Sequence, residues 1–518
     1  MNDSTMYDVA IVGYGPSGVV AAALLGQSGL RVHVCDRLDG VYEIPRAVAL
    51  DHEIMRVFQQ IGVARAVEPF MEPFTDSEYL GVDGRLIRRM TMIAPPYPQG
   101  YTPSVVFTQP EVERVLRSRV AQLSNVEVDL GAEMRRISQG ADAVELELET
   151  RGGGKKRIVA RYAIACDGGS SSVRAQLGMP LEDLDFDEPW LVVDVLVNEQ
   201  GMRKLPKVSV QYCEPERPCT LVLGPGNHRR FEISLLTGED PQQAATTEAT
   251  WRLLSRWLGP EDGELWRQSS YRFHALVAAE WRRSRVFLAG DAAHMQPPFL
   301  GQGMCQGIRD VANLSWKLAA VLNGDVTGRA GDALLDSYGL ERGAHVRELT
   351  SRIKSFGAVI CERDIDKARA RDARMRTEGN GAVRDTPRQD ILPRLERGLL
   401  SAWPHPCRGR LFPQPRVRSG AGTLLLDQLT GNGWRLMLAH RSLAPRDAGG
   451  VQLRARVVAF DDMEEADGVV AAWFMESQCV AALVRPDNYI YGVARSADEV
   501  DELLNEAAAA LDRHAVAA

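Results

Sequence analysis

The stretch YDVAIVGYGPSGVVAAALLGQSGLRVHVCD, residues 7–36, decides the fold of the first part of the chain. An apolar run of strand type, YDVAIV, leads through the glycine pattern GYGPSG into an alanine-rich helical pattern and a second apolar run, RVHVCD. This order predicts a βαβ unit that binds a dinucleotide. Gly13 would form the tight turn, Gly15 would admit a pyrophosphate to the helix N-terminus, and Gly18 would allow close helix–strand packing. Asp36 can then accept hydrogen bonds from a ribose hydroxyl.

Two later segments each predict a strand that ends on an acidic residue. YAIACDGGSSSVRAQL (162–177) predicts a buried strand ending at Asp167 and Gly168, and RVFLAGD (285–291) predicts another ending at Gly290 and Asp291. Open α/β sheets gather ligand groups at the carboxyl ends of their strands. Taken alone, each segment is equally compatible with a turn followed by a helix cap.

The segment GDAAHMQPPFLGQG, residues 290–303, is rich in glycine and proline. Glycines let a ligand approach the backbone and prolines fix its course, so the segment predicts a surface that fits a flat ligand. Gly301, Gln302 and Gly303 precede a helical pattern that starts near Met304, whose free N–H groups would point back at this loop. The alternative is a helix that is simply entered through a Pro/Gly turn.

Composition bounds the class of protein. The 518 residues carry a net charge of -8 with a mean hydropathy of -0.20, which is typical of a globular protein and argues against a nucleic-acid partner. The eight cysteines contain no CxxC, and the nine histidines form no zinc-ligand spacing with them, so we expect no metal and a reducing cytoplasm. The apolar stretch 8–25 contains three glycines and a proline, so it predicts neither a membrane span nor a signal sequence.

Together these segments resemble the group A flavoprotein monooxygenases, the aromatic hydroxylases built on the para-hydroxybenzoate hydroxylase fold. The match follows the order and spacing of the motifs over about the first 340 residues. Within this family the chain is most similar to the 3-(3-hydroxyphenyl)propionate hydroxylases, on PRAVALDHE (45–53), FTQPEVERVL (107–116) and GDAAHMQPPFLGQGMCQGIRDVANLSWKL (290–318). The chain departs from many members at Leu300, where they have glycine, and at Cys305, where they have asparagine.

The resemblance implies an α/β fold with several parts. A Rossmann-like FAD-binding domain would comprise residues 1–185 and 276–366, with an inserted antiparallel-sheet substrate domain over 186–275. The alternating runs WLVVDVLV, KVSVQYC and RRFEISLL support that sheet. The charged, irregular stretch 367–399 predicts a linker or excursion, and residues 400–518 resemble a thioredoxin-like C-terminal domain without CxxC, for which packing or a homodimer contact is expected.

The resemblance also implies the residues that bind the cofactor FAD. Asp291 would bind the ribityl chain, while Asp167 and Gly168 would serve both FAD and a transiently bound NAD(P)H. Arg46 and Gln109 would lie along the flavin. The full expected set is Gly13, Gly15, Gly18, Asp36, Arg37, Arg46, Gln109, Asp167, Gly168, Gly290, Asp291, Gly301, Gln302, Gly303 and Met304.

The implied reaction is hydroxylation of a phenolic aromatic acid, such as 3-(3-hydroxyphenyl)propionate, in aromatic catabolism. NAD(P)H reduces FAD, O2 forms a C4a-hydroperoxide, and one oxygen enters ortho to the phenolic hydroxyl. Pro298 and its neighbour Pro297 would leave carbonyls beside the reacting edge of the flavin and keep it dry. The chain has no second GxGxxG, so the choice between NADH and NADPH stays open.

A base that removes the phenolic proton activates the ring for electrophilic attack. The candidates are Asp51 and His52, followed by Tyr212; the first two could instead cap a helix, and Tyr212 could simply pack. Arg230 is the candidate for pairing with a substrate carboxylate, against the alternative of an exposed strand arginine.

Three other functions remain open at this point. One is the same oxygenase chemistry on a larger polyketide, quinone or N-heteroaromatic ring. Another is a flavin reductase or dehydrogenase that inserts no oxygen, and a third is an FAD-binding escort or redox sensor. The rigid PPFLGQG segment favours the oxygenase, because a protein that only binds FAD has no need to shape the reacting edge of the ring.

Overall fold

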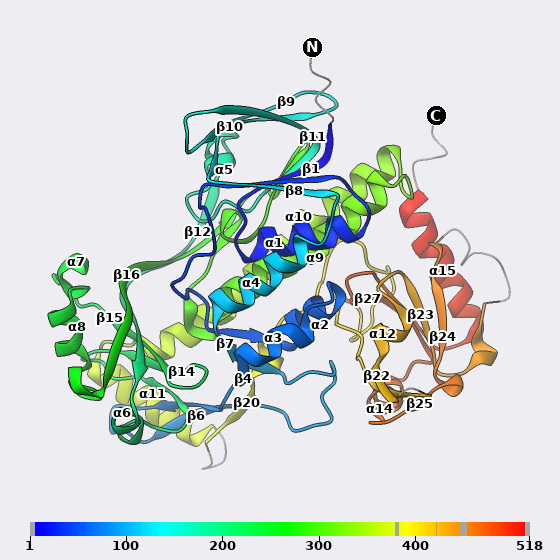
Figure 1. Cartoon of the computed structure of the whole chain (residues 1–518). Coiled ribbons are helices and arrows are strands. Elements are labelled where there is room, and N and C mark those ends of the chain that lie inside the picture. The colour runs from blue at the N-terminus through cyan, green and yellow to red at the C-terminus, as the bar shows by residue number, and fades with distance from the viewer. Residues whose placement is uncertain (1–5, 379–382, 421, 446–452, 513–518) are drawn as a thin grey trace.

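The computed structural model describes residues 6–378, 383–420, 422–445 and 453–512. Its first sheet has the strand order β17-β18-β11-β1-β2-β8, and the hairpin β9–β10 extends one end of β11 (Figure 1). Strands β18, β11, β1, β2 and β8 pair in parallel. The strands are β1 (Tyr7–Val12), β2 (Val32–Asp36), β8 (Val126–Leu130), β9 (Ala132–Gln139), β10 (Val144–Thr150), β11 (Lys155–Ala165), β17 (Arg282–Arg283) and β18 (Val286–Leu288).

The βαβ unit predicted from the opening stretch is formed by β1, α1 (Pro16–Gln27) and β2. The alanine, valine and leucine side chains of α1 are almost all buried, because α9 (Gly303–Leu322) and α4 (Gln109–Val120) pack against this helix. The turn between β1 and α1 needs two glycines. Gly13 has a φ of +99°, and a Cβ on Gly18 would lie 2.0 Å from the carbonyl oxygen of Gly13.

The second sheet has nine strands in the order β19-β16-β12-β15-β14-β13-β5-β6-β20. The alternating runs after residue 186 form its centre, as their pattern predicts, but β5, β6, β19 and β20 come from outside the range 186–275. The strands are β5 (Ser77–Leu80), β6 (Leu86–Thr91), β12 (Leu181–Val197), β13 (Ser209–Tyr212), β14 (Cys219–Leu223), β15 (His228–Ser234), β16 (Gly263–Ala278), β19 (His294–Met295) and β20 (Asp385–Pro387).

The two faces of this sheet have different surroundings. Apolar side chains such as Phe231 and Ile233 pack on one face with residues of α8 (Thr247–Leu254). Residues in the alternate positions, including Arg230 and Glu232, line a cavity on the other face. Two short helices, α6 (Glu199–Lys204) and α7 (Pro241–Ala244), lie beside the sheet at the left of Figure 1.

A three-stranded sheet, β3-β7-β4, also borders the cavity. Its strands are β3 (Ala49–Asp51), β4 (Met71–Pro73) and β7 (Ser104–Phe107), and the helices nearby in sequence are α2 (His52–Gln60) and α3 (Ala64–Val67). The short helix α5 (Ser172–Gln176) follows β11. The central helix α9 is followed by the 33-residue α10 (Gly328–Ile360).

The segment 367–399 was expected to be irregular, and this is wrong for its first part. Helix α11 (Ile365–Thr377) occupies that part, and β20 then adds an edge strand to the substrate sheet by pairing with β6. Arginines, lysine and aspartates dominate α11, so its sequence has no clear apolar stripe. Tertiary contacts stabilise it: the buried Asp372 accepts a hydrogen bond from the Val82 amide, and Arg371 donates one to the Cys213 carbonyl.

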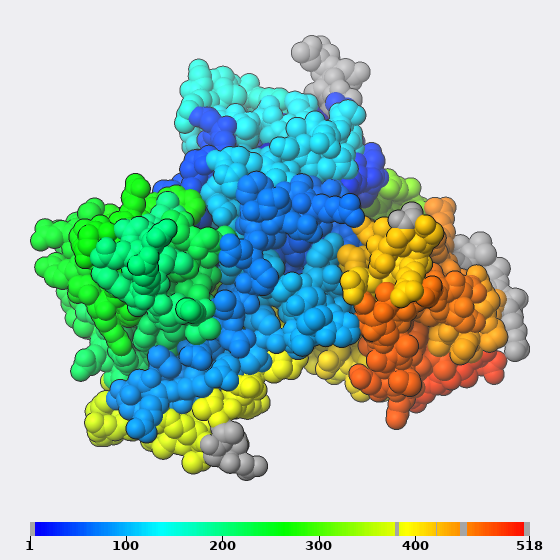
Figure 2. All heavy atoms as spheres, turned by 60° about the horizontal axis from the view of Figure 1, so that its bottom comes forward, coloured from blue at the N-terminus to red at the C-terminus, as the bar shows by residue number. Residues whose placement is uncertain are grey.

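The last hundred residues form a separate lobe, at the right of Figures 1 and 2. Its main sheet has the order β24-β23-β26-β27, in which β23 pairs with β24 in parallel while β26 runs antiparallel to β23 and β27. The elements are β21 (Arg416–Ser419), β22 (Gly422–Leu425), α12 (Leu426–Thr430), β23 (Arg435–Leu438), β24 (Arg456–Ala459), β25 (Glu464–Glu465), α14 (Val469–Ser477), β26 (Ala481–Val484), β27 (Ile490–Ala494) and α15 (Ala497–Asp512). Among the described residues no helix is long and apolar enough to span a bilayer.

Fully buried ion pairs fasten this lobe to the rest of the molecule. Arg485 donates to both carboxylate oxygens of Glu341 on α10, at 3.0 and 2.7 Å, and also pairs with Asp487. Lys317 on α9 lies 2.8 Å from Glu341. Burial by itself opposes ionisation of Glu341, but Arg485 and Lys317 outweigh it and lower the pKa of this carboxyl to about 2.

We expect Arg485→Met to destabilise the protein by about 3–5 kcal/mol, because it leaves the carboxylate of Glu341 buried with one cation fewer. Chemical denaturation at neutral pH measures this. Arg416→Met is the matched control: Arg416 pairs with Asp467 at 2.8 Å but is 59% exposed, so its loss costs about 0–1 kcal/mol. Equal effects of the two substitutions would contradict the role of the buried network.

Candidate active site

A cavity of about 410 Å³ lies between the β1–α1 turn and the polar face of the second sheet. It is continuous from one to the other, and loops from distant parts of the sequence complete its wall. Of the residues singled out in the sequence, those that line it are Gly15, Arg46, Gln109, Gly168, Arg230, Asp291, Pro298, Gly301, Gly303 and Met304.

The glycine turn leaves open space at its centre. A Cβ on Gly15 would meet no protein atom within 4 Å, whereas one on Gly13 or Gly18 would collide with backbone. Asp36 ends β2 beside this turn, and its carboxylate accepts hydrogen bonds from the Tyr14 amide at 2.6 Å and the Leu38 amide at 2.8 Å. The turn therefore has room for a pyrophosphate at the N-terminus of α1.

Two carboxylates at the strand ends have acceptor capacity that the protein does not use. Asp167 accepts from the Val173 amide at 3.1 Å through Oδ2, while its Oδ1 is buried without a hydrogen-bond partner among the described residues. Asp291 is exposed to the cavity but otherwise surrounded by protein, and this desolvation raises the pKa of its carboxyl. Such acceptors suit the hydroxyl groups of a ribityl chain and a ribose, so the residues present fit FAD.

The loop that carries Asp291 is fixed from behind by Asp310 of α9. Asp310 accepts from the Gly290 amide at 3.0 Å and from Arg342 Nε at 2.8 Å, and its Oδ2 lies 2.7 Å from His294 Nε2. All of these groups are buried. His294 therefore supports the loop through Asp310, and it also borders the cavity.

The GQG segment forms the entrance to α9. Gly301 follows the short turn η4 (Pro298–Leu300) with a φ of +61°, and α9 begins at Gly303, where a Cβ would meet no protein atom within 4 Å. Gln302 does not line the cavity; its side-chain oxygen accepts a hydrogen bond from Arg309 at 2.9 Å. The free N–H groups of α9 thus lie at the cavity, where they favour negative charge.

Gln109 connects two segments of the cavity wall. Its Oε1 accepts from the amides of Arg46 and Ala47 at 2.7 and 2.6 Å, and its Nε2 donates to Glu113. Gln109 thus fixes the backbone of the loop from which Arg46 projects. Arg37, by contrast, is exposed and does not line the cavity.

The three candidates for the phenol base lie outside the cavity wall. Asp51 caps α2 by accepting from the Glu53 and Ile54 amides, and it pairs with Arg309. His52 borders a separate, larger cavity. Tyr212 points to the opposite face of the sheet, where its ring packs 5.2 Å from that of Trp257. The geometry therefore supports the capping and packing alternatives for Asp51 and Tyr212 and gives none of the three a contact with a phenol in this cavity.

Arg230 reaches the cavity, but its donors are already engaged. Its Nε and Nη2 bind Asp194 at 2.7 and 3.0 Å, and its terminal nitrogens also donate to the carbonyls of Pro45 and Arg46. The side chain is 3% exposed, so the alternative of a solvent-exposed arginine is wrong. Its charge is balanced by Asp194, which argues against a pairing with a substrate carboxylate.

Other charged residues of the wall were missed at the level of sequence: Arg267 and Arg272 of β16, and also Glu232 and Arg388. Glu232 follows Arg230 by two positions on β15 and so faces the same cavity, a relation that the alternation of RRFEIS could have indicated. Arg388 comes from the segment that was expected to be a linker. It lies over the ring of Phe74 at 4.5 Å, donates to the Leu300 carbonyl, and has no carboxylate partner among the described residues.

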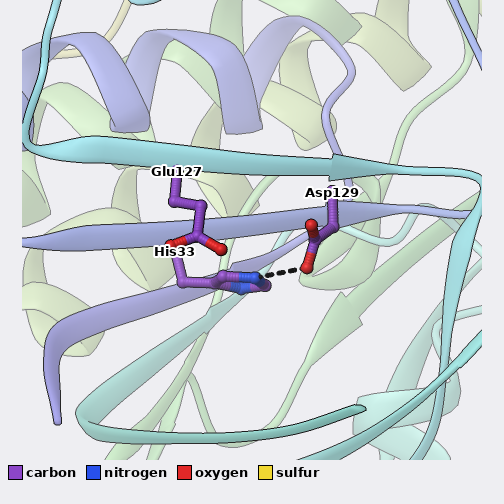
Figure 3. A group of neighbouring side chains, drawn as sticks. All are labelled: His33, Glu127 and Asp129. Carbon is purple, nitrogen blue, oxygen red and sulfur yellow. Dashed lines mark hydrogen bonds and ion pairs between the residues drawn. The ribbon is translucent and has the colours of Figure 1, made fainter. Parts of the chain in front are cut away.

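A cluster with metal-ligand chemistry lies elsewhere, on β2 and β8. Figure 3 shows His33, Glu127 and Asp129 side by side, with His33 Nε2 2.8 Å from Asp129 Oδ2. The ammonium group of Lys156 lies 2.8 Å from Glu127 and 2.6 Å from Asp129. Since this cation already pairs with both carboxylates, we assign the cluster to ion pairing within the sheet.

Comparison with known proteins identifies the class. A family model described as FAD binding domain matches residues 6–353, and a second, described as HcaD C-terminal domain, matches residues 409–510. The chain belongs to the FAD-binding family of flavoprotein hydroxylases. The family predicted from the sequence is thus confirmed, and FAD is the cofactor.

Relatives of this flavoprotein match over nearly their whole length. It is 36% identical over 521 residues to a probable NADH-specific resorcinol 4-hydroxylase of Rhodococcus jostii (strain RHA1). The aligned region covers 97% of this chain and 95% of the relative. It is 33% identical over 538 residues to a 3-(3-hydroxy-phenyl)propionate/3-hydroxycinnamic acid hydroxylase of Mycolicibacterium gilvum (strain PYR-GCK), covering 97% and 92%.

Solved structures share the fold of this flavoprotein. The flavin-dependent monooxygenase PieE, in complex with FAD and substrate, superposes with a TM-score of 0.82 at 20% identity, over 98% of this chain and 99% of the other. Aklavinone-11 hydroxylase, in complex with FAD and aklavinone, gives 0.80 at 22% identity, over 99% and 100%. At this identity the likeness concerns the fold alone.

We expect Gly15→Val to fold normally but to bind FAD roughly ten- to a hundredfold more weakly, because its side chain fills space that only the cofactor uses, at a cost of about 1–3 kcal/mol. Titration of the apoprotein with FAD, followed by flavin fluorescence, measures the affinity. Gly152→Val is the control, since Gly152 also has no neighbour within 4 Å but lies in an exposed turn of the β10–β11 hairpin. Unchanged FAD affinity in Gly15→Val would remove the turn from the cofactor site.

Proposed function

We propose that this flavoprotein is an NADH-consuming monooxygenase that hydroxylates a single-ring phenol ortho to its hydroxyl group. The observation that carries this proposal is the single continuous cavity, which joins the FAD-binding turn to the polar face of the second sheet. One ligand can therefore lie against the flavin while its hydroxyl groups contact the sheet. When bound, FAD takes a hydride from the nicotinamide and activates O2 for transfer of one oxygen atom to the ring.

The protein's own residues bind, orient and shield the cofactor in this proposal. Gly15 and Asp36 would hold the pyrophosphate and a ribose, while Asp167 and Asp291 would accept hydrogen bonds from hydroxyl groups of the chain. The N-terminus of α9 would stabilise the negative charge of the reduced flavin. Pro298 offers no N–H group at the cavity wall and leaves it rigid, which supports its proposed role in excluding water.

The relatives favour a small substrate. Their printed names point to resorcinol and to 3-(3-hydroxyphenyl)propionate. Both are phenols with one ring, and both have a free position beside a hydroxyl group.

The substrate side chain is the point on which these two compounds differ. A carboxylate needs a cation, and Arg230 is already paired with Asp194. Arg388 is a better candidate, because it lines the same cavity, has no acidic partner in the described part of the chain, and desolvation lowers the pKa of its guanidinium. An anionic group of a substrate would relieve this desolvated charge.

We also propose the domain division expected from the sequence, with a discontinuous FAD-binding domain and a substrate sheet. The C-terminal sheet supports a thioredoxin-like domain, because its strand order 2-1-3-4 has only the third strand antiparallel to the rest. The sequence has no CxxC, so packing, including a contact in a homodimer, is the proposed role of this domain rather than dithiol exchange.

The experiment for the proposed function is anaerobic stopped-flow reduction of the bound flavin by NADH, with and without resorcinol or 3-(3-hydroxyphenyl)propionate, followed by addition of oxygen. We expect the aromatic compound to accelerate flavin reduction and one dihydroxy or trihydroxy product to form for each NADH oxidised. Reduction that no phenol accelerates, with hydrogen peroxide as the sole oxygen product, would favour the reductase instead.

We expect Arg388→Met to raise the KM for 3-(3-hydroxyphenyl)propionate about tenfold or more while changing the KM for resorcinol little, because a hydrogen-bonded charge contributes about 1.5–3 kcal/mol. Steady-state NADH oxidation with both compounds measures this. Arg384→Met, an exposed position in the same segment, is the control. Equal changes for the acidic and the neutral phenol would contradict a role for Arg388 in binding a carboxylate.

A further inference from the structure

Glu232 occupies the middle of the cavity-facing side of the second sheet. It lies on β15, with Val192 of β12 on one side and Thr220 of β14 on the other, and it lines the same cavity as the FAD-binding turn. Its side chain is 6% exposed. Within the described part of the chain its carboxylate has no hydrogen-bond or ion-pair partner, and leaving such a group unpaired is costly.

The charged groups around Glu232 are committed to one another. From β15, Arg230 binds Asp194 of β12, and Arg267 of β16 approaches the same carboxylate at 3.7 Å. Cys219 of β14 is a further titratable neighbour, and Tyr271 and His274 of β16 line the same cavity. Desolvation is the dominant influence on Glu232; with Arg230 and Arg267 acting against it and Asp194 acting with it, the pKa of Glu232 rises to about 7.

The neighbouring strands add uncharged polar groups. Thr220 donates its hydroxyl proton to Gln211 Oε1 at 2.6 Å, so the oxygen of Thr220 remains an acceptor. Both residues line the cavity beside Glu232. The sheet thus offers a phenol a row of acceptors in which Glu232 alone can take up a proton near neutral pH.

We propose that Glu232 is the catalytic base that removes the phenolic proton of the substrate, an inference that rests on the proposed hydroxylase function. The O–H bond of the phenol breaks, the proton passes to a carboxylate oxygen of Glu232, and the electron pair stays on the phenolic oxygen. The ring carbon beside that oxygen becomes electron-rich and accepts the transferred oxygen atom. Rearomatisation releases the ring proton, and Glu232 loses its own proton to the product or to water.

The position of the Glu232 carboxylate in the cavity favours it over the three bases predicted from the sequence. Asp51 and His52 lie outside the cavity wall, and Tyr212 lies on the opposite face of the sheet. A carboxylate of ordinary pKa is a weak base toward a phenol. Burial brings the pKa of Glu232 closer to that of a phenol, which is near 10, and so improves the match for proton transfer.

The first test measures binding to the oxidised holoenzyme and needs no turnover. Resorcinol perturbs the absorbance of the bound flavin as it binds, and 1,3-dimethoxybenzene serves as an analogue that cannot donate a hydrogen bond. We expect resorcinol to bind about tenfold more tightly at pH 8 than at pH 6, because only ionised Glu232 accepts its O–H, while the analogue shows no such dependence. In Glu232→Gln the pH dependence should disappear. Its persistence in this variant, or its absence in the wild type, would overturn the proposal.

The second test measures turnover. In the wild type, kcat/KM should fall about tenfold per pH unit below pH 7, as Glu232 becomes protonated. We expect Glu232→Gln to retain FAD, to lose this acid limb and to be slower in kcat by about 10²- to 10⁴-fold. Glu188→Gln is the matched control, since Glu188 is a half-buried carboxyl of β12 with a raised pKa that does not line the cavity. Wild-type kcat and pH profile in Glu232→Gln would overturn the proposal.

Further controls distinguish a failure of the Glu232 proposal from misfolding of the variant and from a failure of the proposed function. Glu232→Asp retains a carboxylate, so it should keep the acid limb at a reduced rate; a flat profile in this variant would also contradict the proposal. If no phenol stimulates the wild-type enzyme, the proposed function fails, but the binding test still decides whether Glu232 accepts a phenolic O–H.

The raised pKa of Glu232 in the folded state also affects the free energy of unfolding. This free energy should fall as the pH rises from 4.5 to 7, and Glu232→Gln should be the more stable protein at pH 8.

Discussion

The pair formed by Asp194 and Arg230 holds the site together. It lies almost without solvent contact in the second sheet, and from there Arg230 donates to the carbonyls of Pro45 and Arg46 in the loop beside the flavin site. Arg267 donates to the same Pro45 carbonyl from β16. Two buried charges are expensive to desolvate, and these contacts to backbone are what make them tolerable. The sheet is thereby fixed against the cofactor loop, and the cavity between them has a defined shape.

The same principle operates at the C-terminal lobe. Arg485 and Glu341 are completely buried, yet they join the last sheet to helix α10. Arg56 of α2 makes a similar contact with Asp427, at 2.6 Å. Ion pairs of this kind are directional and leave an uncompensated charge when they are misaligned, so they define one arrangement of the lobe. That arrangement keeps α9 and α10 in place behind the loop that carries Asp291.

Local patterns explain how far the sequence could predict the site. The turn at Gly13, Gly15 and Gly18 follows from backbone geometry within a few residues, and the strand ends at Asp167 and Asp291 follow from short apolar runs. Both strands are present, but β11 ends at Ala165 and β18 at Leu288, so Asp167 and Asp291 lie in the turns that follow them. Asp51 has the right chemistry for a base, but it precedes a helix and meets Arg309, so its acceptor capacity is spent on capping and pairing. The sequence was compatible with Asp51 as a helix cap and with Asp51 as a base, and the local pattern could not distinguish the two roles.

The sequence by itself determined the βαβ unit, because this unit rests on interactions between residues close in the chain, while the family and its cofactor FAD followed from the resemblance of motifs spaced over about the first 340 residues. Only the tertiary structure decided which charges are free. It paired Arg230 with Asp194, brought Arg388 into the cavity from a segment that was expected to be a linker, and left Glu232 buried without a partner among the described residues. The physical reason is that the state of an ionisable group depends on desolvation and on neighbours from other strands, and neither is encoded in the local pattern.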